Sequence, residues 1–360
     1  MTCWFVRLPL VLGLSLLLSF VVVAQQSSGT ASSQLTSQGI VLLSIKGRTI
    51  TSDEAQRLEQ MLVKDPSDLA SRFTLISYYG AHFTEKAMKA KKCEHILWMI
   101  ENIPGSPLLR HFPQARLTRT DKCLIEGNEL WLKQVESNNG NLEVLRNAID
   151  YFLVPEKLIA EKLVRQGAAA EPQNPEWPQK LGQLYSLQVT FAKDEVRKQF
   201  AKDAVGQYEQ ALKLTTEARS RRSLRMNLAR MAFESGDITT ASSMAATLLT
   251  EADQESTEFF KADLLHGVHS ILGRAALQNG DVSEAKRQLL ASGEVEGSAV
   301  LNSFGPGMSL AKDLLDKNER TVVLEYFVLI SSFWKNDKLQ QWTAIVKSGG
   351  TPDFGGSLSR

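Results

Sequence analysis

The 360-residue chain has little of what most catalytic and metal-binding sites require. It contains five histidines and three cysteines, and it has no G-x-S-x-G, H-E-x-x-H or Cys-x-x-Cys motif. Lys and Arg number 41 against 40 Asp and Glu, so the chain lacks the positive excess typical of nucleic-acid binding. We therefore expect no enzymatic activity, no cofactor and no nucleic-acid partner.

One long apolar run lies at the N-terminus, over residues 8–24, after the single charge of Arg7. Val22 and Ala24 are small residues placed just before Gln25, and this arrangement is typical of a cleaved secretory signal peptide at residues 1–24. The alternative is an uncleaved membrane anchor formed by residues 8–24, although such a run is at the short limit for a span. We favour cleavage and expect an exported protein, periplasmic or extracellular.

Export gives significance to Cys93 and Cys123, because disulfides persist in oxidising compartments. A bond between them would close a loop of about 30 residues and contribute about 3–4 kcal/mol in the chain-entropy model. The alternative is two separate buried thiols. Both alternatives stay open, because the sequence does not show whether the two Cα atoms approach within about 7 Å.

The rest of the chain is organised around a long helical region. Residues 25–38 are rich in Ser, Thr and Gln and predict a flexible tether. Residues 39–50 carry β-branched side chains and a Lys46-Gly47 pair, which predict a short strand or hairpin. Helical periodicity then extends over residues 51–346, and residues 347–360 predict a loose tail.

An internal repeat is the most informative feature of the sequence. Two stretches of the helical region match at six positions, with an offset of 44 residues. The positions are Leu228, Arg230, Ala232, Gly236, Asp237 and Ala241, and they recur as Leu272, Arg274, Ala276, Gly280, Asp281 and Ala285.

The second copy predicts two antiparallel helices joined by a tight turn. Gly280 can adopt the left-handed conformation that ends a helix, and Asp281 can cap the next helix together with Glu284. Gly273 and Ala285 are small where the two helices would approach closely. Such a helical hairpin cannot cover its apolar faces alone, so it predicts stacking of successive hairpins.

The pattern resembles the tetratricopeptide repeat (TPR) family, in which Leu-Gly-x-x-Tyr lies on the first helix of each unit. Leu181, Gly182 and Tyr185 match this half, and Ala204, Tyr208 and Ala211 match the second half about ten residues late. The delay predicts a lengthened first helix or an insertion at residues 188–199. Beyond residue 290 the chain is similar to uncharacterised exported bacterial TPR proteins.

The resemblance implies an all-α, right-handed solenoid of helical hairpins over residues 51–346, clearest over 174–290. TPR arrays present a concave groove built from their first helices. The function implied is therefore an extracytoplasmic scaffold that binds a protein or peptide and has no catalysis of its own.

The resemblance also places a set of side chains in the groove. In TPR proteins the first-helix position two residues after the leading Leu faces the concave surface, and here it holds Arg230 and Arg274. Two guanidinium groups in register could bind a carboxylate-bearing partner, whereas the alternative is that each pairs with its own i+4 neighbour. The candidate groove residues are Gln183, Leu187, Arg230, Glu234, Arg274 and Gln278.

A different class of function depends on Asp263, His266 and His269, which lie three residues apart on an expected helix. Two histidines and a carboxylate are metal-ligand types, so the alternative function is a metal-dependent helical enzyme. The opposing interpretation is that His269 contacts the core or the neighbouring hairpin. We favour the scaffold and expect no metal site.

Overall fold

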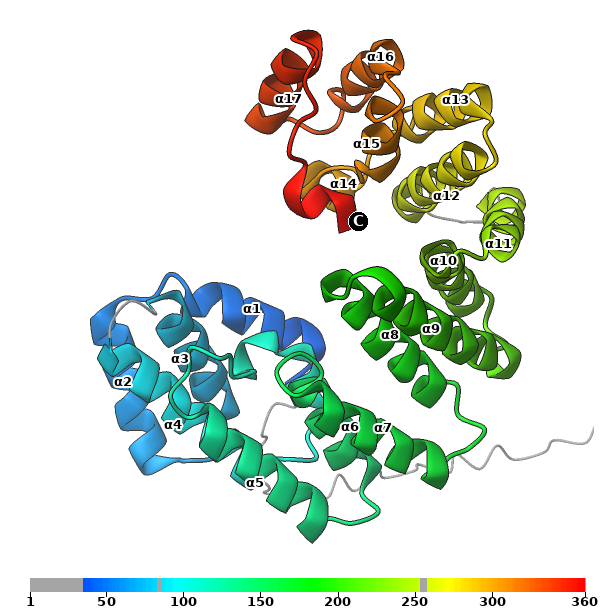
Figure 1. The fold of residues 1–360 in the computed structure, drawn as a ribbon. Helices are drawn as coiled ribbons and strands as arrows, with labels where there is room; N and C mark the ends of the chain where they lie inside the picture. The colour runs from blue at the N-terminus through cyan, green and yellow to red at the C-terminus, as the bar shows by residue number, and fades with distance from the viewer. Residues whose placement is uncertain (1–34, 83–85, 253–257, 360) are drawn as a thin grey trace, which may run out of the picture.

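The computed structural model describes residues 35–82, 86–252 and 258–359, and in this part of the chain the regular elements are all helices, without a β-strand (Figure 1). The expected signal peptide at residues 1–24 and the expected tether up to residue 34 lie outside the described residues. The prediction of a flexible tether up to residue 38 is wrong at its end, because Thr36 caps α1 and residues 37 and 38 begin this helix.

The helices of the N-terminal half are α1 (Ser37–Gly47), α2 (Ser52–Lys64), α3 (Leu69–Ala81), α4 (Lys86–Asn102), α5 (Leu124–Ser137), α6 (Leu142–Phe152) and α7 (Lys157–Ala170), with the short 3₁₀ helices η1 (Pro107–His111) and η2 (Pro113–Ala115) before α5. The middle holds α8 (Glu176–Phe191), α9 (Asp194–Leu214), α10 (Ala218–Ser235), α11 (Ile238–Glu251), α12 (Glu258–Gln278) and α13 (Val282–Gly293). The C-terminal helices are α14 (Ala299–Phe304), α15 (Ser309–Leu315), α16 (Arg320–Ile330), α17 (Asp337–Lys347) and the 3₁₀ helix η4 (Gly355–Ser359).

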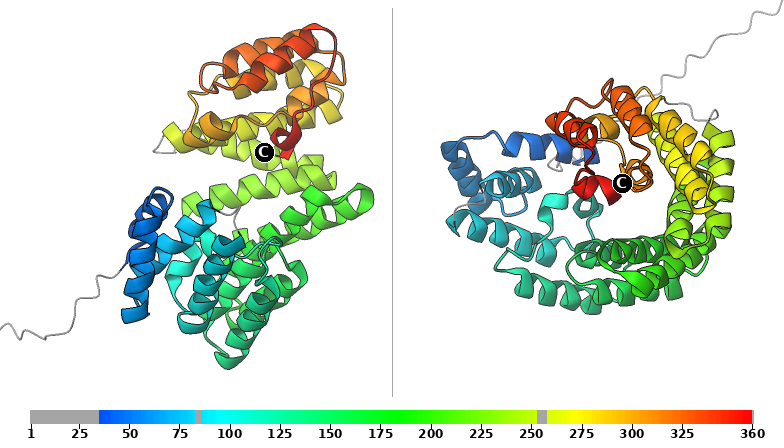
Figure 2. Two further views of the ribbon diagram at one scale, coloured as in Figure 1. Left: turned by 90° about the vertical axis from the view of Figure 1, so that its left-hand side faces the viewer. Right: turned by 45° about the horizontal axis from the view of Figure 1, so that its top comes forward.

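Successive antiparallel hairpins build the solenoid. The pairs α8/α9, α10/α11 and α12/α13 pack against one another in chain order. Their first helices lie on the inner side of the curve and their second helices on the outer side (Figure 1). Figure 1 and Figure 2 show that the array follows an open curve, with the C-terminal segment on its inner side and the C-terminal helices displaced from the N-terminal ones. The predicted all-α solenoid of stacked helical hairpins is thereby confirmed.

The turns between the paired helices have the predicted chemistry. Gly236 and Gly280 end α10 and α12 with φ angles of 89° and 83°, in the left-handed region that glycine tolerates best. Asp237 and Asp281 then cap the following helices, and their side chains accept hydrogen bonds from the backbone N–H groups of Thr240 and Glu284. This repeated Gly-Asp turn sets the antiparallel geometry of each hairpin.

Glycines permit close contact between helices within the repeats. A Cβ added at Gly182 of α8 would lie 2.7 Å from the ring of Tyr208 on α9, and one at Gly273 of α12 would lie 3.0 Å from Cβ of Gln288 on α13.

In the first repeat unit the residues that match the second half of the TPR pattern occur about ten residues later than the pattern expects. The cause is the length of α9, which has 21 residues and begins with the additional residues 194–199. The extra length therefore lies in the second helix rather than the first.

The strand predicted over residues 39–50 is wrong, because residues 37–47 form α1. Thr36 caps this helix by accepting a hydrogen bond from Gly39, and Ile40 is fully buried. Gly47 marks a close approach of α1 to α3, since a Cβ there would lie 2.3 Å from the carbonyl oxygen of Thr74. Packing against α3 has overridden the β-propensity of the Ile and Val residues.

The predicted loose tail at residues 347–360 is also wrong over its described part. Phe354 is buried and packs edge-on against Trp342 at 4.9 Å between ring centroids. The backbone N–H of Met308 donates to the carbonyl oxygen of Ser357, and Ser309 Oγ donates to that of Leu358. The C-terminal segment is therefore docked on α15, on the inner side of the curve (Figure 2).

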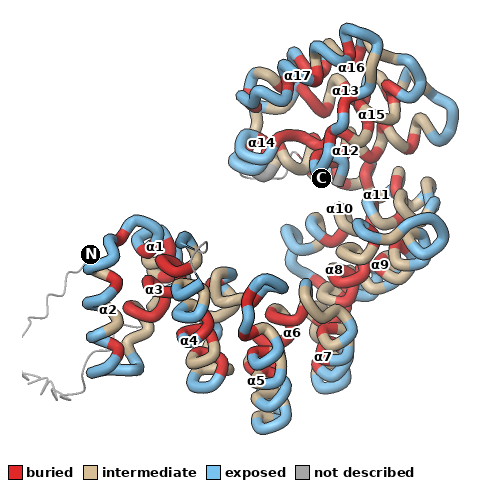
Figure 3. The backbone as a smooth tube through the Cα atoms, turned by 60° about the vertical axis from the view of Figure 1, so that its left-hand side comes forward, coloured by how far each residue is buried: buried red, intermediate tan, exposed pale blue. Residues whose placement is uncertain are grey.

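The core of the described residues consists of four apolar clusters that follow one another along the curve, and buried positions occur in each helix pair (Figure 3). Trp177, Tyr208 and Tyr326 are the largest fully buried side chains. Within the described ranges, no helix is both long and apolar enough to cross a membrane.

Candidate binding sites on the concave face

The inner helices and the docked C-terminal segment surround a cavity of about 470 Å³, which we call the arginine cavity. Its charged wall residues are Arg197, Arg230, Glu234 and Arg274. The remaining wall is formed by Ser186, Val189 and Thr190 of α8, Met231 and Phe233 of α10, His266, Gly267, Ser270 and Ile271 of α12, and Ser309, Gly355, Gly356 and Leu358 near the C-terminus.

A chain of ion pairs crosses the wall of this cavity. Glu234 Oε2 accepts two hydrogen bonds from Arg197, at 2.6 and 2.9 Å, and its Oε1 lies 3.5 Å from Nη1 of Arg274. Arg274 also donates from Nε to Asp313 of α15 at 2.8 Å, and its guanidinium lies 4.2 Å from the centroid of the Phe233 ring. Arg197 and Arg274 are thus both neutralised within the protein.

Arg230 differs from these two arginines, because none of the described residues forms an ion pair or hydrogen bond with its side chain. It has substantial solvent access, yet α8, α10 and α12 enclose it, as expected of a side chain that projects into a hollow. Burial among these helices lowers the pKa of Arg230, but a guanidinium remains charged at neutral pH. The alternative i+4 pairing with Glu234 is wrong, because Glu234 is engaged by the other two arginines.

The structure places the six predicted groove residues in three different kinds of environment. Arg230, Glu234 and Arg274 come together in the arginine cavity, and Leu187 lines a second cavity described below. Gln183 is partly buried on α8 and Gln278 is exposed at the end of α12, and neither contributes to a cavity wall. The sequence pattern did not point to Arg197 or to the C-terminal wall, because it predicts a lengthened first helix or an insertion at residues 188–199 and a loose tail at residues 347–360.

Asp263, His266 and His269 are not brought together as a metal site. His266 is buried and held between two backbone groups: its Nδ1 donates to the carbonyl oxygen of Ser292, and its Nε2 accepts from the N–H of Gly307, both at 2.9 Å. Burial lowers its pKa, so the ring is neutral at pH 7.

The other two candidate ligands are also occupied. His269 Nδ1 lies 2.7 Å from Oε1 of Gln288, and Asp263 accepts a hydrogen bond from Ser298. The part of the chain that the structure describes contains no cluster of three potential metal ligands. The arrangement therefore gives the alternative metal-dependent function no support.

A second cavity, of about 810 Å³, lies on the other side of α8, and we call it the apolar cavity. Its apolar wall consists of Pro113, Leu117, Tyr151, Val154, Pro155, Leu187 and Phe191. Its polar wall residues are Arg116, Thr118, Arg119, Asp150 and Lys157. Residues 186, 189 and 190 of α8 face the arginine cavity, whereas Leu187 and Phe191 face the apolar one.

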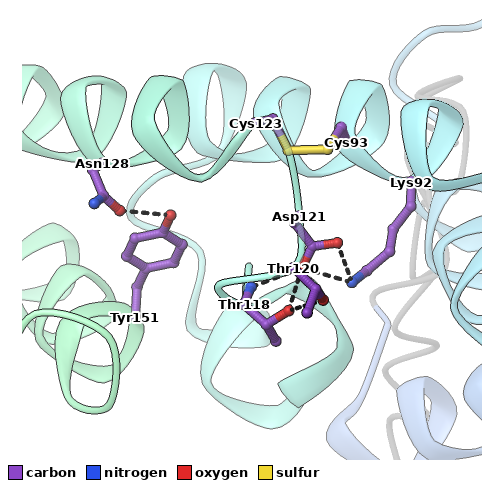
Figure 4. The surroundings of a disulfide bond; sticks show 8 residues. All are labelled: Lys92, Cys93, Thr118, Thr120, Asp121, Cys123, Asn128 and Tyr151. Atoms are coloured by element: carbon purple, nitrogen blue, oxygen red, sulfur yellow. Dashed lines mark hydrogen bonds and ion pairs between the residues drawn. A yellow bond between two sulfur atoms is a disulfide. The ribbon is translucent and has the colours of Figure 1, made fainter. Parts of the chain in front are cut away.

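A disulfide joins Cys93 of α4 to Cys123 at the start of α5, with 6.0 Å between the two Cα atoms (Figure 4). Of the two alternatives that the sequence left open, the structure contains the bond. Beside it, Asp121 accepts hydrogen bonds from the backbone N–H and hydroxyl of Thr118 and lies 3.3 Å from Lys92.

These contacts set the ionisation of Asp121 and fix the loop. Burial by itself would raise the pKa of Asp121, but the contacts of Thr118 and Lys92 hold it below its usual value. The disulfide closes a loop that contains Pro113–Arg119, and these residues form one wall of the apolar cavity.

No protein-family model matches the chain, and no curated protein sequence matches it. Two similar solved structures are a human IFIT1 dimer with m7Gppp-AAAA and a monomeric IFIT1 mutant with Gppp-AAAA, with TM-scores of 0.47 and 0.48. Each is 16% identical over 87% of this chain and 70% of that chain, and the likeness concerns the fold alone.

Proposed function

We propose that this protein is an exported, non-catalytic TPR-like scaffold whose concave face binds a protein or peptide through a carboxylate group. The observation that carries the proposal is Arg230, a charged side chain without a partner among the described residues, projecting into the arginine cavity. Arg230 would bind the carboxylate through paired N–H donors, as guanidinium groups commonly do.

The ion pairs around Arg230 reduce the number of arginines that could bind a partner in this cavity from two to one. The sequence suggested two arginines in register, but Arg274 is neutralised by Asp313 and Glu234. Arg230 is the cation of the cavity wall that forms no ion pair with the described residues, although the Asp263 carboxylate on α12 attracts it, and it matches a single carboxylate. Nucleic-acid binding relies on many neutralised phosphates, and one cation does not provide this.

Export of the protein has two lines of support. The N-terminal sequence has the charge, apolar run and small residues of a cleaved signal, and the disulfide suits an oxidising compartment. We expect the mature chain to begin at Gln25. N-terminal sequencing of the exported protein tests this, and an intact Met1 start in the membrane fraction would favour the anchor formed by residues 8–24.

The partner can be sought with the Arg230→Gln variant, which removes the charge and keeps a polar side chain of similar reach. Arg287→Gln is the matched control, because Arg287 lies on the outer helix α13 and its ion pair among the described residues is with Glu284 on the same helix. Wild type and both variants are immobilised and used to capture proteins from an envelope fraction of the producing cells.

A partner that uses the cavity should be captured by wild type and Arg287→Gln and be lost with Arg230→Gln. The loss of a hydrogen-bonded charge predicts an affinity reduction of about tenfold to a hundredfold for that partner. The proposal fails if Arg230→Gln captures every partner as wild type does. Binding of an RNA oligonucleotide that depends on Arg230 would instead show that the expected class of partner is wrong.

A further inference from the structure

The apolar cavity has the size and lining of a ligand site, and the proposed scaffold function does not use it. Its volume of about 810 Å³ falls within the range of about 300–1,000 Å³ found for small-molecule sites. Leu117 and Tyr151 form a buried floor, whereas Val154 and Phe191 are 65% and 76% exposed. Large apolar side chains that remain exposed beside a hollow indicate a surface that a ligand covers.

The wall of the apolar cavity offers few free hydrogen-bonding groups to a peptide backbone. Tyr151 donates its hydroxyl to Asn128, Thr118 donates its hydroxyl to Asp121, and Asp150 accepts from Lys180 at 2.7 Å. The neutral and acidic polar side chains of the wall therefore already have partners within the protein. A ligand inside the cavity gains mainly from apolar contact, so its buried part should be hydrocarbon.

The remaining polar wall residues are all cations. Arg116, Arg119 and Lys157 form no ion pair with the described residues, and Lys157 Nζ lies 4.8 Å from the centroid of the exposed Phe191 ring. The one acidic wall residue, Asp150, is neutralised by Lys180. Unpaired positive charge beside an apolar hollow is complementary to a molecule with a hydrocarbon chain and an anionic head.

We propose that the apolar cavity binds a long-chain fatty acid, with the alkyl chain against Leu117, Leu187 and Phe191 and the carboxylate among the three cations. The proposal is independent of the scaffold function, because α8 separates the two cavities and Arg230 lines only the other one.

Binding can be measured by displacement of a fluorescent fatty acid from the purified mature protein, with palmitate as the competing ligand. We expect one site per chain and an affinity that falls about fourfold for each methylene removed from the chain. Hexadecanol has a comparable hydrocarbon chain without the charge and should bind about tenfold more weakly, and hexanoate should not compete.

Two variants locate the site. Val154→Trp places a large side chain at the mouth of the cavity and should abolish binding, whereas Val328→Trp, at an equally exposed position on α16, should not. Arg119→Glu should weaken palmitate about tenfold and leave hexadecanol unchanged. Lys213→Glu, which makes the same charge reversal at an exposed position on α9, should have no effect.

The binding measurements on palmitate, hexadecanol and the variants distinguish a fatty-acid site from other occupants. The proposal is overturned if palmitate does not bind, if Val154→Trp binds it as well as wild type, or if hexadecanol competes as strongly as palmitate. Competition by a peptide but not by palmitate would show that the occupant is a protein segment. Because Arg230→Gln should leave palmitate binding intact, failure of this proposal does not affect the test of the scaffold function.

Discussion

The contact between Gly182 and Tyr208 gives a sharp test of the hairpin geometry. A methyl group at position 182 would lie 2.7–2.9 Å from three carbon atoms of the Tyr208 ring, whereas carbon atoms normally approach to about 3.5–4.0 Å. The ring cannot easily give way, because it is 2% exposed and its hydroxyl lies 3.1 Å from Ser186 Oγ. Gly182→Ala should therefore force α8 and α9 apart.

The magnitude follows from two opposing terms. Overpacking of a close contact costs about 1–3 kcal/mol, and replacing a helical glycine with alanine returns about 0.5–1 kcal/mol. We expect Gly182→Ala to lower the free energy of unfolding by about 1–2 kcal/mol.

The matched control is Gly206→Ala on α9, where a Cβ would meet nothing within 4 Å. The same substitution should there be stabilising, by about 0.5–1 kcal/mol. Thermal unfolding of the two variants measures the difference, and their midpoints should move in opposite directions. If both midpoints rise equally, the close approach of α8 and α9 is refuted.

Three further predictions concern the disulfide, a buried histidine and the C-terminus. Loss of the disulfide in the double variant Cys93→Ser with Cys123→Ser should cost about 3–4 kcal/mol, since the bond spans 30 residues, and equal urea midpoints for oxidised and reduced wild type would contradict this. The pKa of His266 is lower in the folded state than in the unfolded chain, so on acidification the unfolded chain binds a proton at a higher pH than the folded protein does. The free energy of unfolding should therefore fall as the pH drops below about 6.5. The His266→Gln variant should show a flatter dependence of Tm between pH 7 and 5.5. Phe354→Ala should cost about 3–5 kcal/mol and make the C-terminus sensitive to limited proteolysis, whereas a loose tail would be cleaved equally in wild type.

The sequence was most informative where local chemistry decides the structure. Gly236 and Gly280 with their following aspartates specify a turn through a left-handed backbone and a helix cap, and both turns were predicted. Periodicity likewise indicated the helices and, through the resemblance, which helices line the inner face. These features depend on residues close together in the chain.

The sequence-based predictions were wrong where contacts between residues far apart in the chain determine the local structure. Residues 39–50 have strand-like composition, and only packing against α3 makes their first part helical. Phe354 lies in a Gly-rich segment that has no helical periodicity, and its place against Trp342 depends on the fold of the last hairpin.

The candidate site shows the same division between local and distant contacts. The repeat located Arg230 and Arg274 on the inner helices, but pairing depends on Arg197 and Asp313, which lie on neighbouring units. A sequence pattern gives the position of a charge along one helix, whereas its neutralisation depends on the three-dimensional arrangement of several helices.

The ion pairs from Arg197 through Glu234 and Arg274 to Asp313 join four helices, α9, α10, α12 and α15, across the wall of the arginine cavity. In a solenoid, small rotations between neighbouring repeats set the curvature, so a chain of charges on the inner side acts as a tie that resists opening. Such a tie weakens as salt screens its partly exposed members. We therefore expect the curvature of the solenoid to relax, and the space inside the curve to widen, as the ionic strength of the surrounding medium rises.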